Sequence, residues 1–400
     1  MAEKNVNTAD RHLSIRYRGR GAQVWIYLGK MIRMFVYQSD WKVLPMSAVI
    51  AGLVSLVIRN KIFVTMEGTM LGGFALVMVC IWNGCFNSIQ AICRERDVIK
   101  REHRSGMHIS SYIAAHMIYQ AMLCSMQTGI TLYVTNLVGV DYPDGGLLTH
   151  WLIFEFGFSM FLISFAADML SLWVSALSRN TTTAMTIMPF VLIFQLVFSG
   201  GMFDLPEWTN AITPFTVSNA GLDLLCTQAD YNDLPINTIW EQVVKMQDVE
   251  ITSEVSVGKV LTLLQNENIE TVAEIRRMSV EEFLSGDASV DPSAAALAAG
   301  SASGKTVGQV IDALCEDPEV RAHWDDEYPI TATVGSLVNA IGQEKVMDIL
   351  THQVAKANQK PEYNNTKGNV IGYWSRIILH ALIYALLAMI TLEFIDKDKR

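Results

Sequence analysis

The chain has 400 residues, of which 51% are hydrophobic and only 18% charged, and its formal net charge is −10. About 25% of the residues in a typical soluble domain are charged, and the mean hydropathy of this chain is +0.27. This composition excludes an ordinary soluble protein and favours one that crosses a membrane several times. We expect no nucleic-acid partner.

The N-terminal region, residues 1–40, is expected to lie in the cytoplasm. Residues 1–20 are polar and lack the apolar core of a signal peptide, so the later apolar segments are expected to stay in the mature protein. Residues 23–38 are mostly apolar and predict an interfacial "elbow" helix, although a plain extension of the first span is the alternative. The polar residues of this segment share one helical face: Gln23, Lys30, Arg33 and Tyr37.

Apolar segments of about 20 residues can cross a hydrocarbon layer of about 30 Å. Six segments have this character: 42–58, 69–92, 109–138, 150–176, 184–203 and 375–394. The sequence therefore predicts an all-α, polytopic membrane protein with six transmembrane helices. Residues 41–227 would hold the first five spans, and residues 371–400 the sixth span and a cytoplasmic tail.

Lysine and arginine residues mark the cytoplasmic side of a membrane protein. They are frequent near the N-terminus, in the loop 93–106 and in the C-terminal tail, whereas residues 141–146 contain none. Only the loop 59–68, with Arg59 and Lys61, argues mildly for the opposite orientation. We expect a multi-pass protein of the cell (plasma) membrane with both termini in the cytoplasm.

The loop 93–106 has the pattern of a charged helical hairpin between two spans. Basic and acidic residues are mixed along it before the chain turns at Gly106 and becomes apolar again at Ile109. On the basic side of a bilayer, such a hairpin offers charged groups to a cytosolic motor protein. The alternative is a solvated loop that merely follows the positive-inside rule.

Two stretches of sequence carry a family resemblance. Residues 178–214 contain a Thr-rich start, a proline inside an apolar segment, then Phe-Ser-Gly, Pro-x-Trp and Thr-Pro. Residues 83–112 carry the other motif: Asn83, Cys85, Phe86, Glu95, Arg101, Glu102, Ser105, Gly106, Ser110, Ser111 and Tyr112. With these motifs in order along the chain and on matching spans, the chain resembles the transmembrane domain of type-2 ABC exporters, most closely the white/brown (G) subfamily. The resemblance covers about 23–226 and the last span.

The resemblance implies roles for three groups of residues. A coupling helix between spans two and three would bind an ATPase through five charged residues, namely Glu95, Arg96, Lys100, Arg101 and Glu102. A substrate pathway would lie between two copies of spans two and five. The residues expected to line it are Asn83, Phe86, Ile193, Phe194 and Val197. An outer valve would fall at Gly201 and Met202, where the family has a bulky apolar pair. The alternative for the pathway residues is ordinary packing between spans.

The sequence contains no nucleotide-binding motif. Residues 299–306, AGSASGKT, resemble a phosphate-binding loop, but Ala299 stands where the motif needs glycine and no strand precedes it. We therefore expect no enzymatic activity, metal or cofactor in this chain. ATP and Mg would be bound by a separate ABC ATPase subunit, present in two copies. The other expected partners are membrane lipid and a second permease copy or a homologous permease.

Residues 228–370 form a large acidic insert before the last span. They hold 23 acidic and 10 basic residues, a net charge of −13, which leaves about +3 for the rest of a chain whose total is −10. We expect a mainly helical extracytoplasmic domain with two lobes, 235–285 and 305–358, joined by an Ala/Ser/Gly-rich connection at 286–304. Members of the G subfamily have a much shorter loop here.

Four ionisable residues fall within predicted spans: Glu155, Asp168, Arg376 and His380. Such groups are costly in a bilayer and usually face a cavity or the interior of the bundle. We favour packing near the outer surface for Glu155 and Arg376, whereas Asp168 fits packing and a polar pathway equally well. The sequence leaves open a disulfide between Cys226 and Cys315.

Together these features predict the permease subunit of an ATP-driven exporter for an amphipathic, lipid-like or peptide substrate. The alternative is a membrane anchor that displays the acidic insert as a binding or sensing domain, without transport. The hairpin at 93–106 argues against this alternative, because an anchor does not need a charged cytosolic hairpin.

Overall fold

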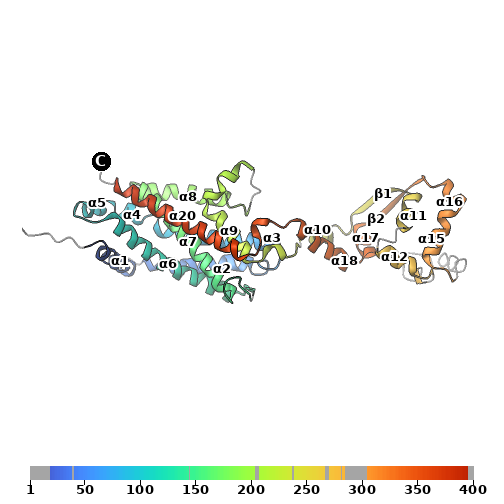
Figure 1. Ribbon diagram of the computed structural model, residues 1–400, viewed down its shortest axis with the longest axis horizontal. Helices are drawn as coiled ribbons and strands as arrows, with labels where there is room; N and C mark the ends of the chain where they lie inside the picture. The colour runs from blue at the N-terminus through green and yellow to red at the C-terminus, as the bar shows by residue number, and fades with distance from the viewer. Residues whose placement is uncertain are drawn as a thin grey trace, which may run out of the picture. The chain divides into compact units, whose positions relative to one another are not determined.

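The chain separates into two compact units in the computed structural model (Figure 1). The bundle unit combines Met1–Ile236 with Val354–Arg400, and the insert unit is Asn237–Gln353. The insert unit is thus shorter at both ends than the expected domain at 228–370. The structure describes residues 19–37, 40–143, 145–202, 207–236, 238–265, 270–280, 282–283 and 304–394.

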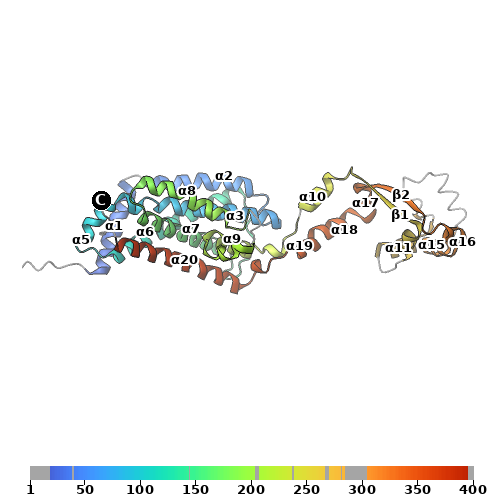
Figure 2. The same cartoon turned by 90° about the horizontal axis from the view of Figure 1, so that it is seen from above.

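The bundle unit is built from long helices that pack side by side (Figures 1 and 2). Helix α7 lies at its centre and packs against α3, α6, α9 and α20. The main helices are α1 (Arg20–Tyr37), α2 (Val43–Ile58), α3 (Met66–Ser88), α4 (Ala91–Arg94), α5 (Arg96–Arg104), α6 (Ile109–Val138), α7 (Leu152–Leu177), α8 (Thr181–Val197), α9 (Val217–Gln228), α19 (Val354–Ala357) and α20 (Lys367–Glu393). Short 3-10 turns connect them: η1 (Asp40–Lys42), η2 (Glu207–Ala211), η3 (Thr213–Phe215), η4 (Tyr231–Asp233) and η6 (Pro361–Tyr363).

Side chains just before several helices fix where those helices begin. The hydroxyl of Thr65 accepts a hydrogen bond from Gly68 N at the start of α3, and the Asn180 side chain accepts one from Thr183 N at the start of α8. These bonds satisfy backbone N–H groups that lack partners within the helix. Helix α6 ends at Gly139, whose φ of 90° lies in the left-handed region that glycine tolerates best.

A glycine allows α3 and α7 to approach closely. A Cβ atom placed on Gly84 would lie only 2.2 Å from the carbonyl oxygen of Ser164 in α7. Small residues at helix contacts are a common means of close packing inside membranes. This explains the glycine within the Asn-Gly-Cys-Phe motif, because the position faces the backbone of the central helix.

Helices occupy all six segments that the sequence predicted as spans. Four are long and apolar enough to cross a membrane by length and composition: Asp40–Ile58, Met66–Arg94, Leu152–Leu177 and Lys367–Glu393. Helix α8 is apolar but has 17 residues. Helix α6 has 30 residues and buries polar side chains such as Gln120 and Gln127. The count of six spans therefore stays a prediction.

Helix α9 was missed by the sequence analysis, which ended the preceding apolar segment at residue 203. Nearly all of its residues are buried against α3, α7 and α20. The sequence analysis did not recognise this helix because of its polar residues, which find their hydrogen-bond and ion-pair partners in other parts of the bundle. The Ser218 hydroxyl donates to Gln195 O at 2.5 Å, and the Asp223 carboxylate lies 4.0 Å from Arg376.

The insert unit is mainly helical, as the sequence predicted, but it also contains a strand pair that the sequence analysis did not find. Strands β1 (Glu250–Ser256) and β2 (Glu327–Thr333) form an antiparallel pair, with Glu250 opposite Thr333 and Ser256 opposite Glu327. Its helices are α10 (Thr238–Lys245), α11 (Val257–Gln265), α12 (Glu270–Arg277), α15 (Val307–Glu316), α16 (Pro318–Ala322), α17 (Val334–Ile341) and α18 (Gln343–Asp348), followed by a π-helical turn, η5 (Ile349–Gln353).

The strand pair links the two lobes that the sequence predicted, 235–285 and 305–358. It joins one half of the insert to the other, and α11 packs on α15 around a small apolar core. That core consists of Leu261, Ile311 and Cys315, with Trp324 packed beside it. The predicted connection at 286–304 lies outside the described residues except for Gly304. Cys226 and Cys315 are both free thiols in the structure, so no disulfide joins them.

Candidate functional site

The predicted coupling region forms two consecutive helices, α4 and α5, at one end of the bundle (Figure 1). Ile99 is the residue of α5 that is buried, and the rest of this helix is exposed or partly exposed. Gly106 then takes a φ of 99° and allows the turn into α6. The segment is therefore a charged element attached to the bundle along one side.

Helix α1 holds both ends of this segment. The Gln23 amide donates to Gly106 O at 3.2 Å and accepts a hydrogen bond from His108 N at 2.9 Å. At the other end, the Lys30 ammonium lies 2.8 Å from a carboxylate oxygen of Glu95. Burial, and then the nearby Glu102 carboxylate, raise the pKa of Tyr27 in α1 above its usual value. The coupling segment and α1 are thus tied together by polar contacts.

The central helix α7 holds the same segment from the opposite side. The Arg96 guanidinium donates to the carbonyl oxygens of Ala176 and Ser178, at 2.8 and 3.0 Å. The hydroxyl of Ser175 accepts hydrogen bonds from Ile92 N and Cys93 N, each at 3.1 Å. A cation at the carbonyl end of a helix satisfies acceptors that lack partners within the helix and complements the helix dipole.

The predicted coupling residues consequently fall into two groups. Glu95 and Arg96 face α1 and α7, and one carboxylate oxygen of Glu102 is also buried. Arg101 is exposed and Lys100 is partly exposed. The exposed face also includes Asp97 and Arg104, which the sequence analysis did not select. Burial could not be read from the charges alone, because charges of both signs occur on both sides of this short helix.

The structure separates the predicted substrate-pathway residues. Asn83 is buried, whereas Phe86, Ile193 and Phe194 are 52%, 58% and 40% exposed; Val197 is partly exposed. Phe86 and Met185 of α8 line one cavity. Ile193 lies eight residues after Met185, about 12 Å further along α8. The structure therefore brings Phe86 next to the start of α8 rather than next to Ile193.

At the predicted outer valve, Gly201 is buried and leaves no room for a side chain. A Cβ atom there would lie 2.9 Å from side-chain atoms of Phe74 and Leu222. The glycine that departs from the family pattern is therefore a packing requirement of this chain. Met202 is 54% exposed.

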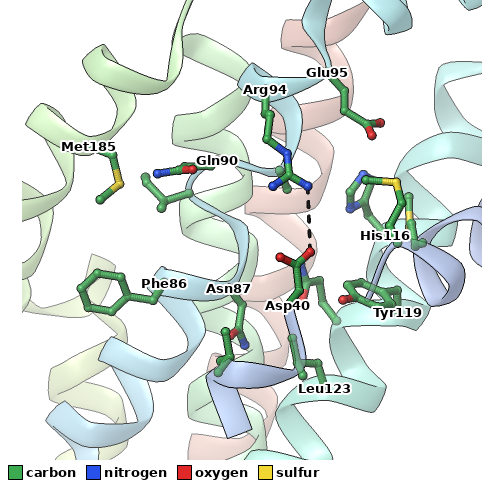
Figure 3. A pocket seen from close by; sticks show the side chains of 16 residues that line it. Asp40, Phe86, Asn87, Gln90, Arg94, Glu95, His116, Tyr119, Leu123 and Met185 are labelled. Carbon is green, nitrogen blue, oxygen red and sulfur yellow. Dashed lines mark ion pairs between the residues drawn. The ribbon is translucent and has the colours of Figure 1, made fainter. Parts of the chain in front are cut away.

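A cavity of about 260 Å³ opens beside the coupling segment (Figure 3). Side chains from α1, α3, α4 and α6 line it, together with Asp40 of η1, Val43 of α2 and Met185 of α8. The Arg94 guanidinium and the Asp40 carboxylate approach within 3.9 Å in its wall. The sequence analysis did not find this cavity, because its lining comes from seven separate helices and turns.

Asp168 and Glu155, two of the ionisable residues expected within spans, each have their own hydrogen-bond partners. Asp168 is fully buried and accepts hydrogen bonds from the Ser88 hydroxyl and, at 3.4 Å, from the Cys124 thiol. Glu155 accepts from Leu148 N and from the Gln228 amide, at 2.9 and 3.2 Å. The described residues contain no group of three His, Cys, Asp or Glu side chains that could hold a metal ion.

Arg376 in α20 is also partnered. Its guanidinium donates to Thr213 O and to the Asn219 side chain, at 3.1 and 3.2 Å. These contacts agree with a packing role near one end of the bundle.

The bundle unit thus combines apolar helices with a charged segment, α4–α5, between α3 and α6. Residues 10–221, more than half of the chain, match the family described as "ABC-2 type transporter". The chain belongs to this family, and it is a multi-pass membrane permease of an ABC transporter. The matched family model describes the membrane domain of these transporters.

A curated relative supports this placement. The chain is 27% identical over 155 residues to the ABC transporter ATP-binding/permease protein Rv1747 of Mycobacterium tuberculosis. The alignment covers 36% of this chain and 18% of the relative. The chain therefore spans only a small part of that protein, whose name joins an ATP-binding and a permease function.

Proposed function

We propose that this chain is the permease subunit of an ATP-driven exporter and that α4–α5 couples it to the ATPase. The observation that carries the proposal is the two-sided character of this segment. Its inner side is fastened to α1 through Lys30–Glu95 and to α7 through Arg96, and its outer side presents Asp97 and Arg101. A docked ATPase could then move the segment and the central helix as one body.

The proposed transport unit contains two permeases and two ATPase subunits. Exposed apolar side chains on α3 and α8, including Phe86, Phe190 and Ile193, would face a second copy of this chain or a homologous permease. The substrate would pass between the copies along this face, and Met202 would lie at its outer end. An apolar path of this kind favours an amphipathic, lipid-like or peptide substrate. ATP and Mg would bind to the ATPase subunits.

The proposed topology has six spans, with both termini in the cytoplasm and the insert unit outside the cell membrane. It rests on the Lys/Arg bias and on the acidity of the insert. The likeness to the G subfamily supports the position of the elbow helix at α1 and of the coupling helix at α5. The enlarged insert is what distinguishes this chain from that subfamily.

A second candidate function is display of the insert unit without transport. The separate core and strand pair of this unit favour it, since they mark a self-contained domain. This function gives no role to the exposed charges of α5, so the two candidates differ in whether an ATPase binds there.

Charge reversal on the exposed side of α5 tests the proposal. The variant Asp97→Lys/Arg101→Glu keeps the inner contacts intact, whereas reversal of Glu95 would break the ion pair with Lys30. We expect affinity-purified permease to retain its normal yield but to lose its co-purifying ATPase. The matched control is Arg59→Glu, an exposed charge in the loop expected on the other side of the membrane. Equal ATPase recovery from wild type and the double variant would overturn the docking site.

A further inference from the structure

The cavity beside the coupling segment contains buried polar atoms that have no hydrogen-bond partner within the protein. His116 and Gln120 of α6 both line it and are 5% and 1% exposed. Neither ring nitrogen of His116 makes a hydrogen bond, and neither does Oε1 of Gln120. The amide nitrogen of Gln120 is already used, since it donates to the Ser88 hydroxyl at 2.8 Å.

Such groups normally have a hydrogen-bond partner, because burying an unpaired donor or acceptor costs free energy. Two buried residues with three unpaired atoms in one cavity wall therefore point to a group supplied from outside the chain. Water alone is a poor match, because Met31, Met34 and Leu123 form an apolar part of the same wall. A cavity with a few converging polar groups on an otherwise apolar lining is typical of a small-molecule site.

The charges in the wall exclude a strongly charged ligand. Arg94 lies 3.9 Å from the Asp40 carboxylate, and Glu95 lies 2.8 Å from the Lys30 ammonium. Each charge thus has an opposite charge beside it, and none requires a counter-ion from the ligand. A charged head group would lose its hydration without gaining a compensating charge.

The unpaired atoms also define which uncharged group fits. Neutral imidazole offers one donor and one acceptor, and Oε1 of Gln120 is an acceptor. A hydroxyl group both donates and accepts, whereas a carboxylate only accepts and an ammonium only donates. We propose that this cavity binds an uncharged amphipathic molecule, with a hydroxyl-bearing head at His116 and Gln120 and an apolar chain along Met34 and Leu123.

This site is distinct from the substrate path of the proposed function. That path lies between two copies of the chain, whereas the cavity lies inside one bundle unit; Phe86 is the residue common to both. Arg94 and Glu95 of the coupling segment form part of the cavity wall. A bound molecule would therefore contact α1, α6 and the segment that precedes the coupling helix at once.

The experiment is a titration of the full-length chain, purified in micelles of an amine-oxide detergent, followed by native mass spectrometry. The probes are 1-monooctanoylglycerol, octanoate and octylamine, which share a similar chain length but differ in their heads. We expect saturable binding of one monooctanoylglycerol per chain. Octanoate and octylamine should bind at least about tenfold more weakly, because each leaves part of the polar wall unpaired.

Two variants locate the site. His116→Leu removes both ring nitrogens and should weaken monooctanoylglycerol binding by about tenfold. Met34→Trp fills the apolar part from α1, leaves the side chains of α6 themselves unaltered, and should abolish saturable binding. The matched control is Leu379→Ala, which removes an exposed side chain of α20 that belongs neither to the cavity nor to the proposed substrate path, and it should bind like wild type.

Three outcomes would overturn the proposal: no saturable binding, which means that the cavity holds water alone; equal binding of all three probes; or undiminished binding by both variants. A second arm distinguishes the source of the ligand. Monooleoylglycerol supplied within phosphatidylcholine nanodiscs tests entry from the bilayer, and monooctanoylglycerol supplied in water tests entry from solution. Binding through either route supports the site and assigns its source.

Discussion

Glu95 and Arg96 are adjacent in the sequence and opposite in charge, yet both point back into the protein. Glu95 pairs with Lys30 of α1, and Arg96 binds carbonyl oxygens at the end of α7. The sequence marked this segment as functional from its charges, but it could not show which charges anchor the segment and which remain for a partner. That division depends on partners more than 60 residues away in the chain.

Gly84 provides a stability prediction at the residue scale. Gly84→Ala would place a methyl group against the Ser164 carbonyl oxygen, at a separation of 2.2 Å if nothing moved. We expect it to force α3 and α7 apart and to lower the free energy of unfolding by about 1–3 kcal/mol. Thermal unfolding in detergent would measure this loss.

The control for that prediction is Gly129→Ala in α6. Apart from its own helix backbone and chain neighbours, no heavy atom lies within 4 Å of a Cβ placed at Gly129. Alanine should therefore be neutral or slightly stabilising there, because it favours the helix more than glycine does. Equal melting temperatures for Gly84→Ala and wild type would contradict the close approach of α3 and α7.

At the scale of elements, apolar periodicity located the long helices but not the elements with mixed character. All six predicted spans fall on helices, since an unbroken run of about 20 apolar residues has few other stable states in a membrane. Helix α9 was missed because its Ser218 and Asp223 find partners only in the folded bundle. The β1–β2 pair was missed because its strands are far apart in the sequence and are stabilised by each other.

The exposed face of helix α8 leads to a prediction about where two permease copies meet. Few of its residues are buried, and Phe190 is 70% exposed. If this face meets a second permease, Phe190→Cys should form a disulfide-linked dimer under mild oxidation. The six native cysteines are buried, so their background should be low. The matched control is Leu379→Cys on α20, a 56% exposed position expected to face lipid. Dimers from Leu379→Cys but not from Phe190→Cys would move the interface away from α8.

At the scale of the whole molecule, the two units differ in charge and in construction. The acidic insert unit has its own core, and the bundle unit carries the basic coupling segment. Charge separation of this kind is expected when the units lie on opposite sides of a membrane. The sequence predicts this partition from composition and not from particular contacts, and the side of the membrane on which each unit lies stays a prediction.

Thiol labelling in intact cells tests the orientation. Asp325 in the insert unit and Arg101 in α5 are both exposed. An impermeant maleimide should label Asp325→Cys in intact cells and Arg101→Cys only after the membrane is opened. The reverse pattern would invert the topology and remove the basis for ATPase docking at α5.

The central claim is that α4–α5 transmits motion between the ATPase and α7, and Arg96→Gln tests it most directly. This change weakens the bonds to Ala176 and Ser178 while the exposed charges of α5 remain. The measurement is ATP hydrolysis by the purified permease–ATPase complex in nanodiscs, relative to the ATPase alone. We predict that the ATPase still co-purifies with Arg96→Gln but that the permease-dependent part of hydrolysis falls about tenfold. A complex that assembles fully and hydrolyses ATP at the wild-type rate would contradict transmission through this segment.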